Sequence, residues 1–168
     1  MPVITTDRLK LITFTVDMMC ASLQGKEAFE KISNYYVDDE YPMEDYKQLL
    51  PYKIDRFQQF PEEMEWEGII IHRDSQTIMG DMGFKGGPNS EGVMDLGYSI
   101  VTSYQGKGYA TEMAKAMVEW GLRQPRVNRI TASCDESNLP SIRVLEKAGF
   151  KRVGKEEQEI YWSIAGGD

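Results

Sequence analysis

The fold of this chain is decided by SIVTSYQGKGYATEMAKAMVEWG, residues 99–121. The stretch opens as the end of an apolar strand and closes with apolar residues at helical spacing. Between the two lies a short turn in which Gly106 and Gly108 flank Lys107. The spacing predicts a helix over residues 109–123, entered directly from a strand through a glycine-rich turn.

A turn of this composition suits an anionic ligand. The first N–H groups of a helix have no partner within the helix, and the helix dipole adds partial positive charge there. Gly106 and Gly108 carry no side chain that would hold a phosphate away from the backbone, Lys107 adds a cation, and Ala110 and Thr111 are small. From composition alone, a tight structural connection that binds nothing is an equal alternative.

The whole chain has the balance of an ordinary globular protein. Its 168 residues predict one domain over residues 1–168, with 41% hydrophobic and 27% charged residues. The net charge of -8 argues against a basic surface for nucleic acid. Cys20 and Cys134 are far apart, so we expect free thiols in a reducing compartment rather than disulfides.

Targeting and metal signals are not evident in the sequence. The opening MPVITTDRLKL has no basic segment followed by an apolar one, and no apolar run reaches the ~20 residues of a membrane span. We therefore expect a cytoplasmic protein that does not engage a membrane. No His, Cys and carboxylate cluster has metal-ligand spacing, so no metal is expected.

The remaining periodicities predict an alternation of strands and helices. The central strand–helix–strand unit requires at least one parallel pair in a mixed sheet. Gly25 is a candidate break in the first helix, and Pro51 is expected to kink or interrupt the second. The expected elements are a strand over 8–15, helix over 16–33, loop over 34–42, helix over 44–60, hairpin over 67–89, strand over 92–101, helix over 109–123, strand over 129–135, helix over 138–148 and one or two strands over 150–165.

Two motifs resemble a known family. QGKGYA, residues 105–110, resembles the Q/R-x-x-G-x-G/A signature of the GNAT N-acetyltransferases. ESNLPSIRVLEKAGFKRVG, residues 136–154, resembles the ribosomal-protein N-acetyltransferase-like branch of that family, the RimJ/RimL type, with its N-x-x-S-x-x-x-x-x-K-x-G-F run. The resemblance spans nearly the whole chain, is specific over residues 95–154 and is loose over residues 34–66. The matching residues of the second motif are Asn138, Ser141, Lys147, Gly149 and Phe150.

The resemblance implies an α/β fold of the α+β type. Its sheet would be mixed and mostly antiparallel, with six to seven strands flanked by helices. It also implies that acetyl-coenzyme A is the acetyl donor and that an amine accepts the acetyl group. The turn would hold the pyrophosphate, and the strand end would bond the pantetheine through its backbone. A second group of residues would contact the cofactor from its far side. The implied cofactor residues are Gln105, Gly106, Lys107, Gly108, Tyr109, Ala110 and Thr111 in the turn, Ile100 and Val101 at the strand end, and Asn138, Ser141 and Arg143 on the far side of the cofactor.

Transfer from a thioester to an amine needs a group that removes the ammonium proton and one that protonates the thiolate. Asp95 and Glu136 are the candidate bases, at opposite ends of the strands beside the expected cleft. The alternatives are a satisfied strand-edge charge for Asp95 and a solvated loop carboxylate for Glu136. Ser141 or a tyrosine is the candidate proton donor, and the absence of a tyrosine from residues 139–148 favours Ser141. The alternative to a cofactor role is that Asn138 is only an N-cap and Ser141 only a residue of the first helical turn. A Cys134–His72 dyad is disfavoured, because Cys134 alternates as a buried strand residue.

The acceptor side is predicted from an aromatic and acidic segment. Tyr35, Tyr36 and Asp39 suit a cationic amine through cation–π and charge contacts, and a solvated acidic loop is the equal alternative. Two rival functions stay open at this point. One is an acyl-coenzyme A-binding sensor or partner domain without turnover, and the other is a phosphate-binding module for another nucleotide. A monomer and a homodimer are both compatible with the sequence.

Overall fold

The computed structural model describes residues 2–166, and its elements follow the periodicities of the sequence. The helices are α1 (Val16–Gln24), α2 (Lys26–Ser33), α3 (Glu44–Gln59), α4 (Tyr109–Leu122) and α5 (Leu139–Lys147), with 3-10 turns at Pro61–Trp66 and Thr102–Tyr104. The strands are β1 (Ile4–Thr5), β2 (Leu9–Thr13), β3 (Tyr36–Val37), β4 (Glu67–His72), β5 (Thr77–Phe84), β6 (Val93–Ile100), β7 (Arg129–Asp135), β8 (Lys151–Glu156) and β9 (Glu159–Ala165).

One sheet contains all nine strands, eight of them in the order β1-β2-β4-β5-β6-β7-β9-β8. Along this path only β6 and β7 are parallel, and the short β3 pairs in parallel with β5. The expected mixed, mostly antiparallel sheet is confirmed. The expected count of six to seven strands is too low, because β1 and β3 have two residues each and are too short to produce an alternating pattern.

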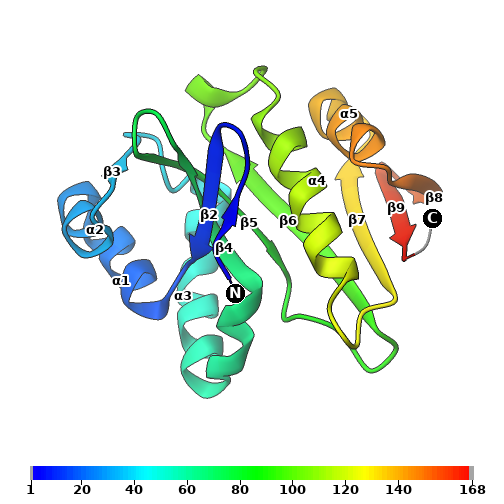
Figure 1. Ribbon diagram of the computed structural model, residues 1–168, viewed down its shortest axis with the longest axis horizontal. Coiled ribbons are helices and arrows are strands. Elements are labelled where there is room, and N and C mark those ends of the chain that lie inside the picture. Colours follow the sequence, from blue (N-terminus) through cyan, green and yellow to red (C-terminus); the bar gives the residue numbers. More distant parts are fainter. Residues whose placement is uncertain (1, 167–168) are drawn as a thin grey trace.

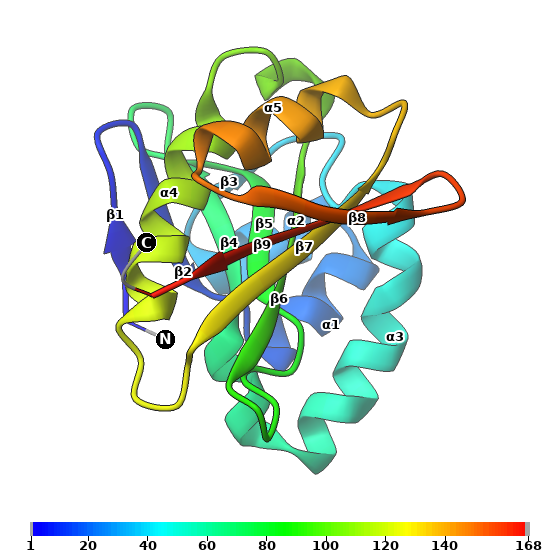
Figure 2. The ribbon, with the colours of Figure 1, turned by 90° about the vertical axis from the view of Figure 1, so that its right-hand side faces the viewer.

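The helices cover both faces of the sheet. In Figure 2, α4 lies on one side of the sheet and α1 and α3 lie on the other, while α5 sits over the ends of β7 and β9 (Figure 1). Gly25 divides the first helical segment into α1 and α2, and its φ of 134° explains the break. The expected interruption at Pro51 is wrong, since α3 runs through it from Glu44 to Gln59.

The core lies against the central strands. β4 and β5 are buried along almost their whole length, as expected for strands with neighbours on both edges and helices on their faces. On the α4 side, Met113 and Met117 are fully buried against this sheet. Within residues 2–166, no helix has the length and apolarity to cross a membrane.

Candidate functional site

The parallel strands β6 and β7 stay together for only part of their length. Residues 93–95 pair with residues 129–131, and beyond that point the two strands separate. The rest of β6 pairs only with β5, and the rest of β7 pairs only with β9. The split leaves two strand edges facing each other with unused N–H and C=O groups, which an extended ligand can bond as an added strand would.

The glycine turn stands at the end of β6, where the split is open. Gly106 has φ 74° and Gly108, the N-cap of α4, has φ 84°, a region that favours glycine. A Cβ at Gly106 would meet no atom within 4 Å, so the space in front of the turn is open. The bare backbone and the N-terminus of α4 therefore face the same open space, as an anion site requires.

Arg8, which lies just before β2, contacts this turn although the two are far apart in the sequence. Its Nη1 donates to the backbone carbonyl of Lys107 at 2.9 Å, and its Nε pairs with Glu112 Oε1 at 2.7 Å. The guanidinium also lies 4.3 Å from the ring centroid of Tyr109. These contacts hold the turn in shape before any ligand arrives, which lowers the entropic cost of binding. Sequence reasoning missed Arg8, because its partners lie about a hundred residues away in the chain.

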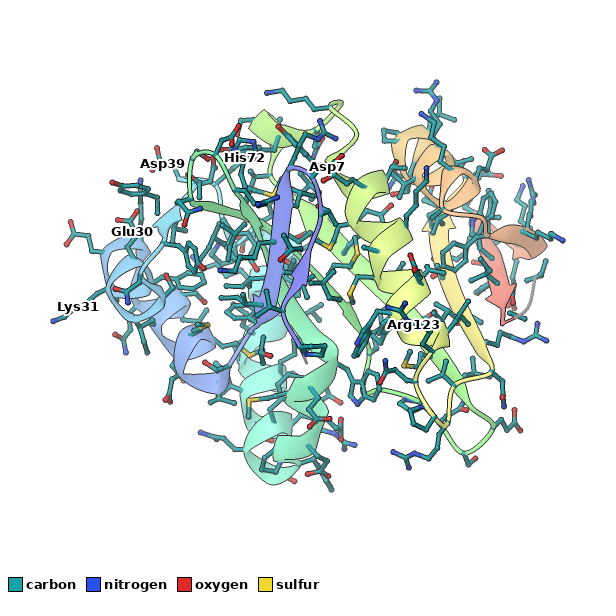
Figure 3. The ribbon with its side chains drawn as sticks, in the orientation of Figure 1. Asp7, Glu30, Lys31, Asp39, His72 and Arg123 are labelled. Atoms are coloured by element: carbon teal, nitrogen blue, oxygen red, sulfur yellow. The ribbon has the colours of Figure 1, made fainter. Side chains whose placement is uncertain are left out.

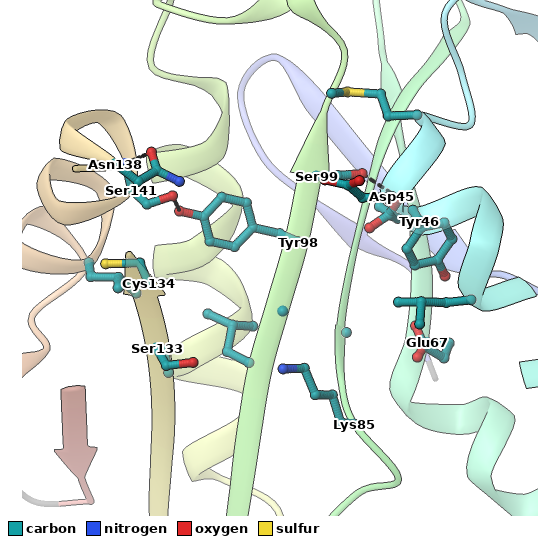
Figure 4. A pocket seen from close by; sticks show the side chains of 18 of the residues that line it. Asp45, Tyr46, Glu67, Lys85, Tyr98, Ser99, Ser133, Cys134, Asn138 and Ser141 are labelled. Carbon is teal, nitrogen blue, oxygen red and sulfur yellow. Dashed lines mark hydrogen bonds between the residues drawn. The ribbon is translucent and has the colours of Figure 1, made fainter. Parts of the chain in front are cut away.

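A cavity of about 380 Å³ lies beside the split, and Figure 4 shows it from close by. On one side are Tyr98, Ser141 and Asn138, and on the other are Asp45 and Tyr46 of α3. The Tyr98 hydroxyl donates to Ser141 Oγ at 3.1 Å and so bridges β6 and α5. Burial raises the pKa of Tyr98, which keeps it protonated and able to donate this bond.

Two buried carboxyl groups line the same cavity. Glu67 of β4 forms an ion pair with Lys53 of α3. Asp81 of β5 is only 3% exposed and accepts hydrogen bonds from Ser99 Oγ at 2.7 Å and from the Tyr41 hydroxyl at 3.0 Å. Burial raises the pKa of Asp81 to about 7, against the lowering effect of both hydrogen bonds. A buried carboxyl that titrates near neutrality is a feature of functional sites.

The predicted bases lie outside this cavity. Asp95 is the last residue of β6 that pairs with β7. It accepts from Thr131 Oγ1 at 2.8 Å and pairs with Lys85 at 2.9 Å. Glu136 follows β7 and forms an ion pair with Lys155 of β8. Neither carboxylate lines the cavity, whereas Asp81, which the sequence analysis did not select, does.

The predicted cofactor residues are brought together around the split. Asn138 caps α5 by accepting from the Ser141 N–H at 3.2 Å, and both side chains reach the cavity. Arg143 of α5 is exposed. The Gln105 side chain turns back and donates to the carbonyl of Ile100 at 2.7 Å, so it ties the turn to the end of β6.

The predicted acceptor residues lie beside α2, and none of the three lines the cavity. The Tyr35 hydroxyl accepts from Lys10 at 2.8 Å, and Tyr36 is 68% exposed. Asp39 forms an exposed ion pair with Lys26 at 2.5 Å, on the side of the molecule opposite α5 (Figure 3). The cavity wall on that side comes from α3 instead.

A Cys134–His72 dyad does not form. His72 is on β4 and Cys134 on β7, three positions apart in the sheet or roughly 14 Å. The His72 ring contacts the Tyr109 hydroxyl through Nε2 at 3.1 Å and Ser75 through Nδ1 at 2.8 Å. Among residues 2–166, no group of three or more His, Cys, Asp and Glu side chains is placed to hold a metal ion.

Comparison with known proteins gives a consistent picture. The family model described as an acetyltransferase (GNAT) domain matches residues 8–151. The N-acetyltransferase YjdG of Bacillus subtilis is 32% identical over 169 residues, which cover 96% of this chain and 97% of that protein.

Solved structures share the fold at low sequence identity. The ribosomal-protein-S5-alanine acetyltransferase of Vibrio fischeri superposes with a TM-score of 0.70 at 16% identity and covers 100% of this chain and 98% of its own. The ribosomal L7/L12 alpha-N-protein acetyltransferase RimL, in complex with coenzyme A, superposes with a TM-score of 0.70 at 15% identity and covers 98% of both chains.

Proposed function

This chain belongs to the GNAT acetyltransferase family and is an N-acetyltransferase, and on that premise we propose how it works. It transfers the acetyl group of acetyl-coenzyme A to a primary amine of a small molecule or a protein N-terminus. The amine attacks directly while both substrates are bound. The observation that carries the proposal is the split between β6 and β7, which opens onto the glycine turn at the start of α4.

The donor fits the residues around the split. The pyrophosphate would be held by the N–H groups of residues 105–111, with Lys107 as the added cation. The pantetheine would lie along the free edge of β6, beside Ile100 and Val101. The Val101 N–H and C=O already bond Met79 and Tyr104, so backbone bonds to the ligand would come from Ile100 and the residues before it. Asn138, Ser141 and Arg143 would border it from α5. Bound in this way, the donor would supply a thioester for attack by the amine.

The role of Ser141 follows from its hydrogen bond. Its Oγ accepts from Tyr98, so its own proton is free to be donated elsewhere. We propose that Ser141 gives this proton to the leaving thiolate. Tyr98, held protonated by burial, fixes the orientation of the serine hydroxyl.

Ser141→Ala is expected to lower kcat about tenfold, a loss of about 1.4 kcal/mol of transition-state stabilisation. The KM for acetyl-coenzyme A should change little, because the backbone contacts remain. Steady-state thiol release measures both constants. Ser137→Ala, a change at an exposed serine of the turn that precedes α5, is the matched control. A loss confined to KM would make Ser141 a binding residue rather than a proton donor.

Asp95 and Glu136 are candidate bases of this proposal.

The acceptor side is proposed from the segment that holds Tyr35, Tyr36 and Asp39. This segment continues into Glu40, whose carboxylate accepts from the Thr102 N–H at 3.0 Å and from the Thr102 hydroxyl at 2.8 Å. This contact docks the acidic segment beside the end of β6. We propose that an acceptor enters between this segment and α3.

The experiment that tests the function is a thiol-release screen with acetyl-coenzyme A and separate amines. Spermidine, an aminoglycoside and a peptide with a free N-terminus represent the acceptor classes. We expect amine-dependent release with at least one of them, together with a thermal shift by acetyl-coenzyme A. A thermal shift without release for any amine would favour the non-catalytic acyl-coenzyme A-binding domain. A shift by ATP that coenzyme A does not compete away would favour the nucleotide module.

Two further properties belong to the proposal. Cys20 and Cys134 are both free thiols, which fits a reducing, cytoplasmic environment. The protein would act as a monomer or a homodimer, and size-exclusion chromatography with light scattering distinguishes the two.

A further inference from the structure

The floor of the cavity is bare backbone. Gly83 of β5 and Gly97 of β6 stand directly opposite each other in the sheet and both line the cavity. A Cβ at Gly83 would come within 2.6 Å of the Trp66 carbonyl, so no side chain fits there. At Gly97 a Cβ would meet only the end of the flexible Lys85 side chain. The backbone of two facing glycines thus forms part of the cavity lining, with the Trp66 carbonyl close to Gly83 and the end of Lys85 close to Gly97.

Asp81 lies beside this glycine pair. It pairs with Ser99 across the strands, two residues along from the glycine pair and therefore on the same face of the sheet. Both of its hydrogen bonds, from Ser99 and from Tyr41, end on Oδ2. Among the described residues Oδ1 accepts no hydrogen bond, and the Asp81 side chain lines the cavity. One oxygen anchors the carboxyl and the other is left for a ligand in the cavity.

The other carboxylates nearby are either paired or exposed, and Asp45, the third carboxylate that lines the cavity, is an exposed residue of α3. Glu67 is neutralised by Lys53, and Asp95 is held by Lys85 and Thr131 outside the cavity. Among the described residues Asp81 forms no ion pair, and the nearest cation that acts on it, Lys53, is itself paired with Glu67. A group that must accept a proton from an ammonium needs this combination of fixed orientation, a free oxygen and no competing cation.

We propose that Asp81 is the catalytic base, and that the acceptor is a primary ammonium that lies over the Gly83–Gly97 floor against its Oδ1. The proposal rests on the acetyltransferase function proposed above. Asp81 takes one proton from the ammonium and later releases it to solvent. The nitrogen lone pair forms the C–N bond as the C–S bond breaks. The second nitrogen proton is released to solvent, and Ser141 takes up one proton from solvent to replace the one that it gives to the thiolate. The net products are an amide, a thiol and one proton.

The test compares two small amines of the same shape. Ethylamine is protonated at neutral pH and must lose a proton before it can attack, whereas methoxyamine is uncharged and can attack without that step. In Asp81→Asn we expect kcat/KM for ethylamine to fall about 10²–10⁴-fold. The value for methoxyamine should change by only a few-fold, because the amide keeps the size of the side chain and still accepts from Ser99 and Tyr41. Asp55→Asn, the same change on an exposed residue of α3, is the matched control.

Three results would overturn the proposal, and they differ from one another. An equal loss for both amines would make Asp81 a structural residue. A selective loss for ethylamine in Asp95→Asn, with Asp81→Asn unaffected, would assign the base to Asp95. If the wild type releases thiol with neither of these amines nor with any amine of the screen above, while acetyl-coenzyme A still raises its melting temperature, the transferase function itself fails, and the role of Asp81 fails with it. Circular dichroism of each variant confirms that it is folded.

Discussion

Gly106→Trp is expected to abolish the stabilisation that acetyl-coenzyme A gives to the folded protein. A ligand that binds only the folded state at ~100 times its Kd adds about 2.7 kcal/mol to the free energy of unfolding. An indole at Gly106 would project into the open space in front of the turn, because a Cβ there meets no protein atom. That space is where we propose the pyrophosphate lies. Thermal shift at a range of acetyl-coenzyme A concentrations measures the effect.

The matched control is Gly86→Trp. Gly86 lies in the turn that precedes β6, with φ 73°, whereas Gly106 follows β6 with φ 74°. Both changes therefore impose the same backbone strain of about 1–2 kcal/mol on the protein without ligand. Only Gly106→Trp should lose the ligand-dependent shift. If acetyl-coenzyme A still stabilises Gly106→Trp as it does the wild type, the turn does not hold the cofactor and is a structural connection only.

The parts of the site that sequence reasoning reached depend on local chain geometry. The turn at Gly106 and Gly108 and the cap at Asn138 involve residues close together in the chain. Their turn and capping residues have specific conformational requirements, so the pattern predicts the structure. The strand–helix–strand unit between them then placed the two motifs beside one another, because β6 and β7 are parallel.

Asp81 shows why the rest was missed. It stands in TIMGDMGF, where a single carboxylate inside an apolar strand was the only available signal. Its partners are Ser99, across a strand pair, and Tyr41, forty residues away. Register decides whether Asp81 faces Ser99 or a neighbouring residue, and a shift of one residue would turn it to the other face. Composition gives no information on that register.

Helix α3 illustrates a tertiary effect that overrides a local rule. Pro51 removes one backbone donor and predicts a break. The helix nevertheless continues, with Leu50 and Phe57 buried against the sheet layer. Burial of two large apolar side chains contributes about 1.5–3 kcal/mol each, enough to offset the cost of the proline. This continuity matters for function, because α3 carries Tyr46 and Lys53 to the cavity.

Asp81→Asn is expected to stabilise the protein at neutral and alkaline pH while it removes activity. The pKa of Asp81 is raised from 3.8 to about 7, first because burial disfavours its charged form. Between these two values the folded protein holds a proton that the unfolded chain has released. Stability therefore falls as the pH rises through this window. The charged groups that act on Asp81 are Glu67, which raises its pKa, and Lys53, which lowers it.

An amide at this position has no charge to bury and still accepts from Ser99 and Tyr41. The variant and the wild type should be about equally stable near pH 4, where both side chains are neutral. By pH 8 the variant should be more stable by about 4 kcal/mol, the equivalent of a shift of about three pKa units. Urea unfolding at a series of pH values measures the difference. A stability difference that does not change with pH would mean that Asp81 is ionised throughout this pH range. Its free oxygen would then belong to a permanent anion rather than to a base that takes up and releases a proton.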